Sequence, residues 1–228
     1  MQDELSVVDR MQERIDRWDQ ANDPRAVFLS CYALMTRNML GALDTGEFAD
    51  AAWVSHLLNH FAGYYFDALD AYEAGEERAP DVWRRAHDAA RRPNTPAISL
   101  LLLGVNAHIN YDLVLAVADR LGPEWPALSD EGRRARYEDY CRVNDVIGRT
   151  IDSVQDTILD KREPIMALVD TLFGPVDEWL VSRGITEWRE EVWRHAIRRV
   201  ETTDDAQREV LRQEVEAAAM RWARLFDF

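Results

Sequence analysis

The sequence predicts an all-α protein, an irregular antiparallel bundle of many helices around one buried central helix. Apolar residues recur at spacings of three and four along most of the chain, which is the period of a helix with one face in the core. No stretch shows the alternation of a half-buried strand. The expected loops are short, so consecutive helices should pack antiparallel. With 228 residues, the chain should form a single all-α domain over 1–228, in which 204–228 is a C-terminal helix that packs on the rest.

Turn-forming residues mark where the expected helices begin and end. Asn22-Asp23-Pro24 separates the first helix from the second, and Asp44-Thr45-Gly46 separates the second from the third. Gly75 ends the third helix and Pro80 begins the fourth. Thr95-Pro96 begins the fifth, with the threonine as its cap. The bounds expected for individual helices are 48–72, 100–121, 129–160, 176–182, 186–200 and 203–226, with breaks at Glu163-Pro164 and Gly174-Pro175.

The segment Leu100–Leu121 is the central helix of this prediction. It is apolar on all sides except in its middle, which is typical of a helix buried on every side. At about 100° per residue, His108 and Asp112 share one face one turn apart, and Asn106 and Asn110 share another. An unpaired buried polar group costs about 1–3 kcal/mol, so both pairs need partners. Any chemistry is therefore expected around this helix.

The charge of the chain limits its partners. There are 42 acidic residues against 27 basic ones, a net charge of -15, which repels nucleic acid and anionic membranes. We therefore expect a small-molecule ligand, no nucleic acid and no membrane. The two cysteines form no motif, and no basic and apolar leader precedes the first helix, so a cytoplasmic location is expected. An apolar face of the last helix could pair two copies in a homodimer through Leu211, Val215, Met220, Trp222, Leu225 and Phe226.

Residues Leu101–Leu113, LLLGVNAHINYDL, resemble the signature of a bacterial family known as domain of unknown function 5995. The similarity extends in order over roughly residues 28 to 200. The resemblance implies a helical fold and indicates no particular reaction. Further similar positions are Phe61, Ala62, Tyr65, Ala68, Leu69, Tyr72, Trp83, Ala86, Asp139, Tyr140, Val143, Asn144, Trp193 and Ala196.

The leading hypothesis is an enzyme that acts on a small, largely apolar molecule between the third, fifth and sixth helices. A carboxylate one turn from an imidazole can orient it and raise its basicity, which predicts His108 as the acid–base residue and Asp112 as its partner. The reaction could be that of a lyase, isomerase, cyclase or hydrolase. The residues expected to bind the substrate are Asn106, Asn110, Asn144, Tyr64 and Tyr111.

A second hypothesis is a metal-dependent enzyme. His56 and His60 lie one turn apart and could join His108 and Asp112 across the bundle in a four-ligand set. Zinc or non-haem iron accepts such ligands. No cofactor other than such a divalent metal is expected.

A third hypothesis is a non-catalytic binding or scaffold protein, in which the polar residues of the central helix only fix how the helices pack. In that case His108→Ala or Asp112→Ala should reduce stability and no ligand should be found. An enzyme should instead lose activity.

Overall fold

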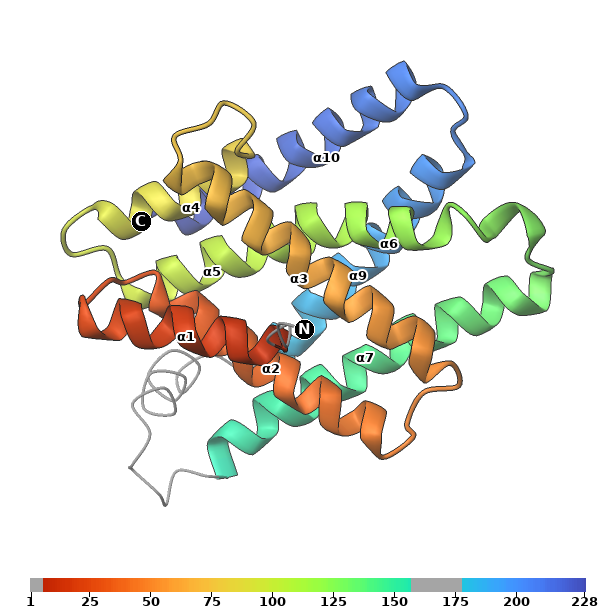
Figure 1. Cartoon of the computed structure of the whole chain (residues 1–228), viewed down its shortest axis with the longest axis horizontal. Helices are drawn as coiled ribbons and strands as arrows, with labels where there is room; N and C mark the ends of the chain where they lie inside the picture. Colours follow the sequence, from red (N-terminus) through yellow and green to blue (C-terminus); the bar gives the residue numbers. More distant parts are fainter. Residues whose placement is uncertain (1–5, 157–177) are drawn as a thin grey trace, which may run out of the picture.

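The computed structural model describes residues 6–156 and 178–228 of the chain. In these residues every regular element is helical and no strand occurs (Figure 1). The prediction of an all-α bundle is confirmed. The elements are α1 (Val7–Gln20), α2 (Ala26–Asp44), α3 (Ala51–Glu73), α4 (Asp81–Arg91), α5 (Ala97–Ala107), the π-helical turn η1 (His108–Asp112), α6 (Leu113–Leu121), the 3-10 turn η2 (Trp125–Ala127), α7 (Asp130–Asp156), α9 (Glu178–Glu201) and α10 (Asp205–Phe226).

The central column of the molecule is formed by α5, η1 and α6, which follow one another through its middle (Figure 1). Five helices, α2, α3, α4, α9 and α10, pack against this column. The buried central helix is thus present as predicted, and most of its apolar residues are buried. Its fully buried members include Leu101, Leu103, Ala107, Val114, Ala116, Val117 and Leu121.

Two helical segments have the length and apolar composition that a membrane span needs, Ala26–Asp44 and Ala97–Leu121. In this fold, 50% of the first apolar window and 78% of the second are buried. The core helix of a soluble protein has the same length and composition.

The junction between α7 and the start of α3 depends on one buried carboxylate. Asp139 accepts hydrogen bonds from the backbone N–H groups of Ala49 at 2.8 Å and Asp50 at 2.7 Å. Asp50 in turn caps α3, because its side chain accepts from the Trp53 N–H at 2.9 Å. Since this cap stops the helix from extending backwards, α3 begins at Ala51, later than the sequence predicted.

The predicted cap of the central helix is wrong. Thr95 donates its hydroxyl to the Ala89 carbonyl at 2.8 Å and thereby fixes the loop that follows α4. No side chain caps α5. At the predicted start of the helix 129–160, by contrast, the Ser129 hydroxyl accepts from the Gly132 N–H at 3.2 Å, as an N-cap does.

The break predicted between 182 and 186 is also wrong, since α9 continues from Glu178 to Glu201. Glycine inside a helix costs about 1 kcal/mol relative to alanine, and Gly184 lies inside α9. The packing of α9 against α6 and α7 outweighs that cost. The breaks predicted at Glu163-Pro164 and Gly174-Pro175 lie outside the described residues.

The last helix, α10, packs against α4, α5 and η1. Leu211 and Val215, which the sequence placed on an exposed apolar face, are buried against the bundle. Trp222 and Leu225 are exposed. The apolar residues of α10 are therefore divided between the core and the surface.

Candidate functional site

The site is organised by His108 and Asp112, which the π-turn η1 brings together. In this turn the Leu113 N–H donates to the carbonyl oxygen of His108, five residues earlier. Such turns occur frequently at functional sites. Nδ1 of His108 lies 2.9 Å from Oδ2 of Asp112. Only 3% of His108 and 1% of Asp112 is exposed, so the pair lies inside the bundle.

A tryptophan from α4 completes the surroundings of the carboxyl group. Nε1 of Trp83 donates to both oxygens of Asp112, at 3.1 Å to Oδ1 and 2.9 Å to Oδ2. Asp112 therefore has hydrogen-bond partners on both sides, one on its own helix and one on α4. This arrangement fixes the carboxyl group and, through it, the plane of the imidazole.

Aromatic rings hold the imidazole from the side of α2 and α3. The Phe61 ring stacks on His108 with 3.6 Å between ring centroids and 9° between planes. The Tyr32 ring meets it edge-on at 4.3 Å. Phe28, which approaches the imidazole at 5.9 Å, extends this frame. The imidazole is consequently held in one orientation by one stacked ring and two edge-on rings.

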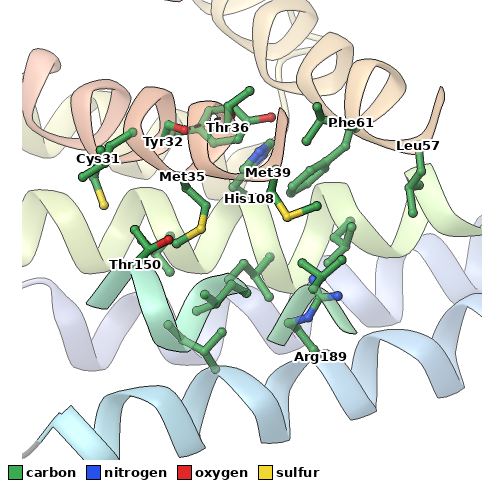
Figure 2. Close-up of a pocket in the computed structure, with 18 of the residues that line it drawn as sticks. Cys31, Tyr32, Met35, Thr36, Met39, Leu57, Phe61, His108, Thr150 and Arg189 are labelled. Atoms are coloured by element: carbon green, nitrogen blue, oxygen red, sulfur yellow. Dashed lines mark hydrogen bonds between the residues drawn. The ribbon is translucent and has the colours of Figure 1, made fainter. Parts of the chain in front are cut away.

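Two polar atoms of this cluster have no hydrogen-bond partner in the described part of the chain. Nε2 of His108 and the hydroxyl of Tyr32 are buried without a hydrogen bond to any described residue. Both residues line a cavity of about 170 Å³, which we call the inner cavity (Figure 2). The other buried side-chain atoms without a partner in the described part of the chain, such as Nε2 of His87, belong to residues that do not line it. The inner cavity is lined mainly by apolar side chains, among them Met35, Met39, Val54, Leu57, Leu58, Phe61, Val105, Ile109, Val143 and Ile147.

A buried arginine lines the inner cavity on the side of α9 (Figure 2). Nε of Arg189 donates to Oδ1 of Asn144 at 2.6 Å, and Nη2 donates to the Tyr140 carbonyl at 2.7 Å. The guanidinium also lies 4.2 Å from the centre of the Tyr140 ring. These contacts fix the guanidinium in the wall of the cavity.

On its other side, Asp112 lines a second, more polar pocket of about 610 Å³, which we call the outer pocket. Tyr64, Tyr111, Arg212 and Glu216 contribute to its walls. The carboxyl group of Asp112 thus lies between the imidazole, which faces the inner cavity, and the outer pocket.

Burial shifts both members of the central pair towards their uncharged forms. Loss of contact with water lowers the pKa of the His108 imidazole well below its usual value. The same effect raises the pKa of Asp112 well above that of an ordinary carboxyl group, although the hydrogen bond from Trp83 opposes the rise. Near neutral pH the pair therefore carries no net charge.

Comparison with models of known protein families assigns the chain to a family. The model of the family of unknown function DUF5995 matches residues 5–226, almost the whole chain. The chain belongs to the DUF5995 family. No curated protein and no solved structure matches it. The family therefore accounts for the resemblance seen in the sequence, and the match now includes the C-terminal helix of this DUF5995 protein.

The glycine of the DUF5995-like segment LLLGVNAHINYDL permits a close contact on the cavity side. A Cβ atom at Gly104 would lie 2.4 Å from Cγ of Phe28, far inside van der Waals contact. Phe28 packs against Tyr32 and Trp83 as well as His108. Because position 104 has no side chain, α2 can approach the central column closely enough to place these rings.

The two asparagines of the same DUF5995 segment do not line the inner cavity. Nδ2 of Asn110 donates to Oδ1 of Asn106 at 2.9 Å, and Nδ2 of Asn106 donates to the Ala219 carbonyl at 3.0 Å. These bonds tie the central column to α10. Asn144, also predicted to bind substrate, instead holds Arg189.

The two tyrosines predicted to bind substrate lie at the outer pocket of this DUF5995 protein. The Tyr64 hydroxyl donates to Oδ2 of Asp119 at 2.5 Å, and the Tyr111 hydroxyl accepts from Nη1 of Arg212 at 2.7 Å. Neither lines the inner cavity. The predicted substrate-binding residues are therefore distributed over three places.

The four predicted metal ligands are not brought together. His56 and His60 are exposed on α3, and the His60 ring lies 3.3 Å from Asp119 at the surface. His108 and Asp112 are buried. Among the described residues no group of three or more His, Cys, Asp or Glu side chains is placed to hold a metal ion.

Sequence reasoning missed the residues that complete the site from other helices. Trp83 was noted only as a position similar to the family, whereas it hydrogen-bonds Asp112. Tyr32, Phe61 and Arg189 had no assigned role. The only signal was that Trp83 and Phe61 belong to the positions that are similar to the family. That signal was weak, because nothing local in the sequence connects these residues to His108.

Proposed function

We propose that this protein is an enzyme that binds a small, largely apolar molecule in the inner cavity and transfers a proton through Nε2 of His108. One observation carries the proposal: Nε2 is buried, has no partner among the described residues and lines an apolar cavity beside the equally unpaired Tyr32 hydroxyl. Since an unsatisfied buried polar group costs about 1–3 kcal/mol, a ligand that binds both atoms would remove a penalty that the free protein bears.

The state of the central pair favours proton donation. Because the pair carries no net charge, it holds two exchangeable protons between Asp112 and His108. The shared proton lies either on Oδ2 of Asp112 or on Nδ1 of His108, and both arrangements keep their 2.9 Å hydrogen bond. In each of them the second proton is on Nε2. The atom that faces the cavity is then a donor, which suits a substrate carbonyl, hydroxyl or alkene carbon.

The position of Asp112 suggests what happens to the charge. When Nε2 gives its proton to the substrate, the shared proton can rest on Nδ1, and the negative charge remains on the Asp112 carboxylate. Trp83 donates to both oxygens of that carboxylate. Asp112 also lines the outer pocket, from which solvent can return a proton. The pair would thus connect the apolar inner cavity to the polar outer pocket.

These features favour reactions that need a proton donated to, or taken from, an apolar substrate, as in lyases, isomerases and cyclases. The Tyr32 hydroxyl would bind the same polar atom of the substrate as Nε2, because the two rings meet at 4.3 Å. Burial and the nearby Asp112 raise the pKa of Tyr32 although the Thr36 side chain opposes the rise, so the Tyr32 hydroxyl stays protonated. Tyr32 would therefore act as a hydrogen-bond donor rather than as a base.

The test begins with a thermal-shift screen of small apolar carbonyl compounds and alcohols, followed by mass-spectrometric detection of products. His108→Gln keeps a polar side chain of similar length but cannot transfer the proton. We expect it to bind the ligand and to lower kcat by about 10²–10⁴-fold. Full activity in a folded His108→Gln protein would refute the catalytic role. Binding without turnover by the wild type would favour the alternative of a non-catalytic binding protein.

A further inference from the structure

Arg189 is a buried charge that has no counter-charge among the described residues. Only 5% of the residue is exposed. Its two hydrogen-bond acceptors, the Asn144 side-chain amide and the Tyr140 carbonyl, are both neutral. No carboxylate of a described residue lies within ion-pair distance of its guanidinium. A buried arginine normally pairs with an acid, because removing its charge from water is costly.

The guanidinium is also held so that one of its sides makes no hydrogen bond to a described residue. Asn144 binds Nε, the Tyr140 carbonyl binds Nη2, and the Tyr140 ring lies against the guanidinium at 4.2 Å. Nη1 makes no hydrogen bond to a described residue. An arginine fixed in this way binds a planar anion at little further entropic cost.

Arg189 and His108 line the same cavity from different helices, α9 and η1 (Figure 2). The walls between them are mainly apolar, with Met39, Leu57 and Phe61 among the side chains. A ligand that satisfies both ends would need an anionic group at one end, an apolar body, and a polar acceptor near Nε2.

We infer that the substrate is a small apolar carboxylic acid whose carboxylate binds Arg189 while its reacting group faces His108 and Tyr32. This inference rests on the proposed function, since it takes the inner cavity as the substrate site. An apolar cavity of about 150 Å³ binds benzene, and the inner cavity measures about 170 Å³. The body of the acid should therefore be roughly the size of benzene or a short alkyl chain.

Asn144 is a positioning residue in this account. It accepts from Nε at 2.6 Å and so determines where the free side of the guanidinium lies. The sequence predicted Asn144 as a substrate-binding residue, and the structure supports an indirect role through Arg189.

Matched pairs of probes test the inference on the wild-type protein. Affinities for butyrate, hexanoate and benzoate are measured by calorimetry beside those for butanol, hexanol and benzyl alcohol, which keep the apolar body and lack the charge. Phenylphosphonate distinguishes a carboxylate site from a general anion site. We expect an acid to bind about 10- to 100-fold more tightly than its alcohol, as a charge-assisted hydrogen bond implies. Equal affinities, tighter binding of phenylphosphonate than of benzoate, or no binding of any acid would overturn the inference.

Two variants locate the effect. Arg189→Leu should abolish the preference for the acid over the alcohol, and Arg189→Lys should retain part of it. If Arg189→Leu proves unfolded by circular dichroism, the wild-type comparison of acid and alcohol still decides the question. His108→Gln should keep the preference for the acid while it loses turnover. If the wild type prefers acids and the His108→Gln variant retains normal turnover, the result contradicts the proposed function but not the inference about the acid. The failure of one can therefore be distinguished from the failure of the other.

Discussion

The two polar pairs on the central column, Asn106 with Asn110 and His108 with Asp112, differ in how their hydrogen bonds are satisfied. On the side of α10, Asn110 binds Asn106 and Asn106 binds the Ala219 carbonyl, so these amides act within the protein. On the side of α2 and α3, Asp112 binds Nδ1 of His108, whereas Nε2 lines a cavity and has no partner among the described residues. In each pair the two residues are four positions apart, and both pairs lie in one short segment. Spacing alone therefore does not show which polar side chains find partners within the protein, whereas an atom at a cavity that lacks a partner among the described residues marks a candidate for ligand binding.

His87 provides the first way to sharpen this comparison. Its Nε2 is also buried without a partner in the part of the chain that the structure describes, but His87 does not line the inner cavity. Burial lowers its pKa from 6.5 to about 3. In the unfolded chain the imidazole takes up a proton as the pH falls below about 6.5, whereas the folded protein does not. The stability that depends on neutral His87 is therefore complete above that pH and is lost as the pH falls towards about 3.

We expect His87 alone to lower the free energy of unfolding by about 1.4 kcal/mol per pH unit, or roughly 3 kcal/mol between pH 6 and pH 4. His87→Phe should lessen this acid sensitivity and leave the affinity for ligands of the inner cavity unchanged. Urea unfolding of both proteins at several pH values measures the slope. An unchanged slope would show that His87 is already protonated in the fold.

Asn106→Leu tests the side facing α10. The change removes the acceptor of the Asn110 amide and the donor to the Ala219 carbonyl, so both hydrogen bonds are lost. We expect a loss of about 2 kcal/mol in the free energy of unfolding, measured by urea denaturation. Affinity for a bound acid or alcohol should not change. Asn110→Ala is the control and should cost less, because Asn110 is only partly buried and makes one of the two bonds. A stable Asn106→Leu protein that no longer binds ligand would reverse the assignment of the two sides.

Gly104→Ala tests how the rings around His108 are placed. The added methyl group would lie 2.4 Å from Cγ of Phe28, so Phe28 must move. Overpacking of this kind costs about 1–3 kcal/mol, and the displaced ring should also weaken ligand binding. Gly63→Ala is a matched control, since a Cβ atom there meets nothing within 4 Å. It should be neutral or stabilising by about 0.5–1 kcal/mol. Thermal unfolding of the two variants side by side measures the difference, and equal effects would contradict the close contact.

Tyr32→Phe has the smallest expected effect on stability. Its hydroxyl is buried without a partner among the described residues, so removing it should change the free energy of unfolding by less than about 1 kcal/mol, in the stabilising direction. Ligand affinity should nevertheless fall, because the hydroxyl would be the second donor to the substrate. Thermal-shift and calorimetric measurements on one preparation give both numbers. A marked loss of stability would mean that the hydroxyl is hydrogen-bonded in the free protein.

The sequence predicted the central column well because its evidence is local. Apolar residues on all sides of Leu100–Leu121 indicated burial, and the four-residue spacing placed His108 beside Asp112. Even the π-turn, which the sequence did not predict, left that pair within hydrogen-bonding distance. Helix periodicity alone was sufficient for these conclusions.

The remainder of the site depends on contacts between distant segments. Trp83, Phe61 and Arg189 reach the column from α4, α3 and α9, and no local pattern shows which helices pack together. The same limit explains why Asn106 and Asn110 were expected to bind substrate. The sequence showed that they share a face, but it did not show that this face meets α10.

The protonation of Nε2 of His108 tests the central claim most directly. Long-range ¹H–¹⁵N NMR of the imidazole, assigned with the His108→Gln variant, reports whether Nε2 carries a proton and whether its environment changes. The account predicts a protonated Nε2 at neutral pH whose resonance moves when hexanoate or benzoate is added, while the side-chain amide of Asn106 stays unchanged. An Nε2 resonance that no bound compound alters would contradict it.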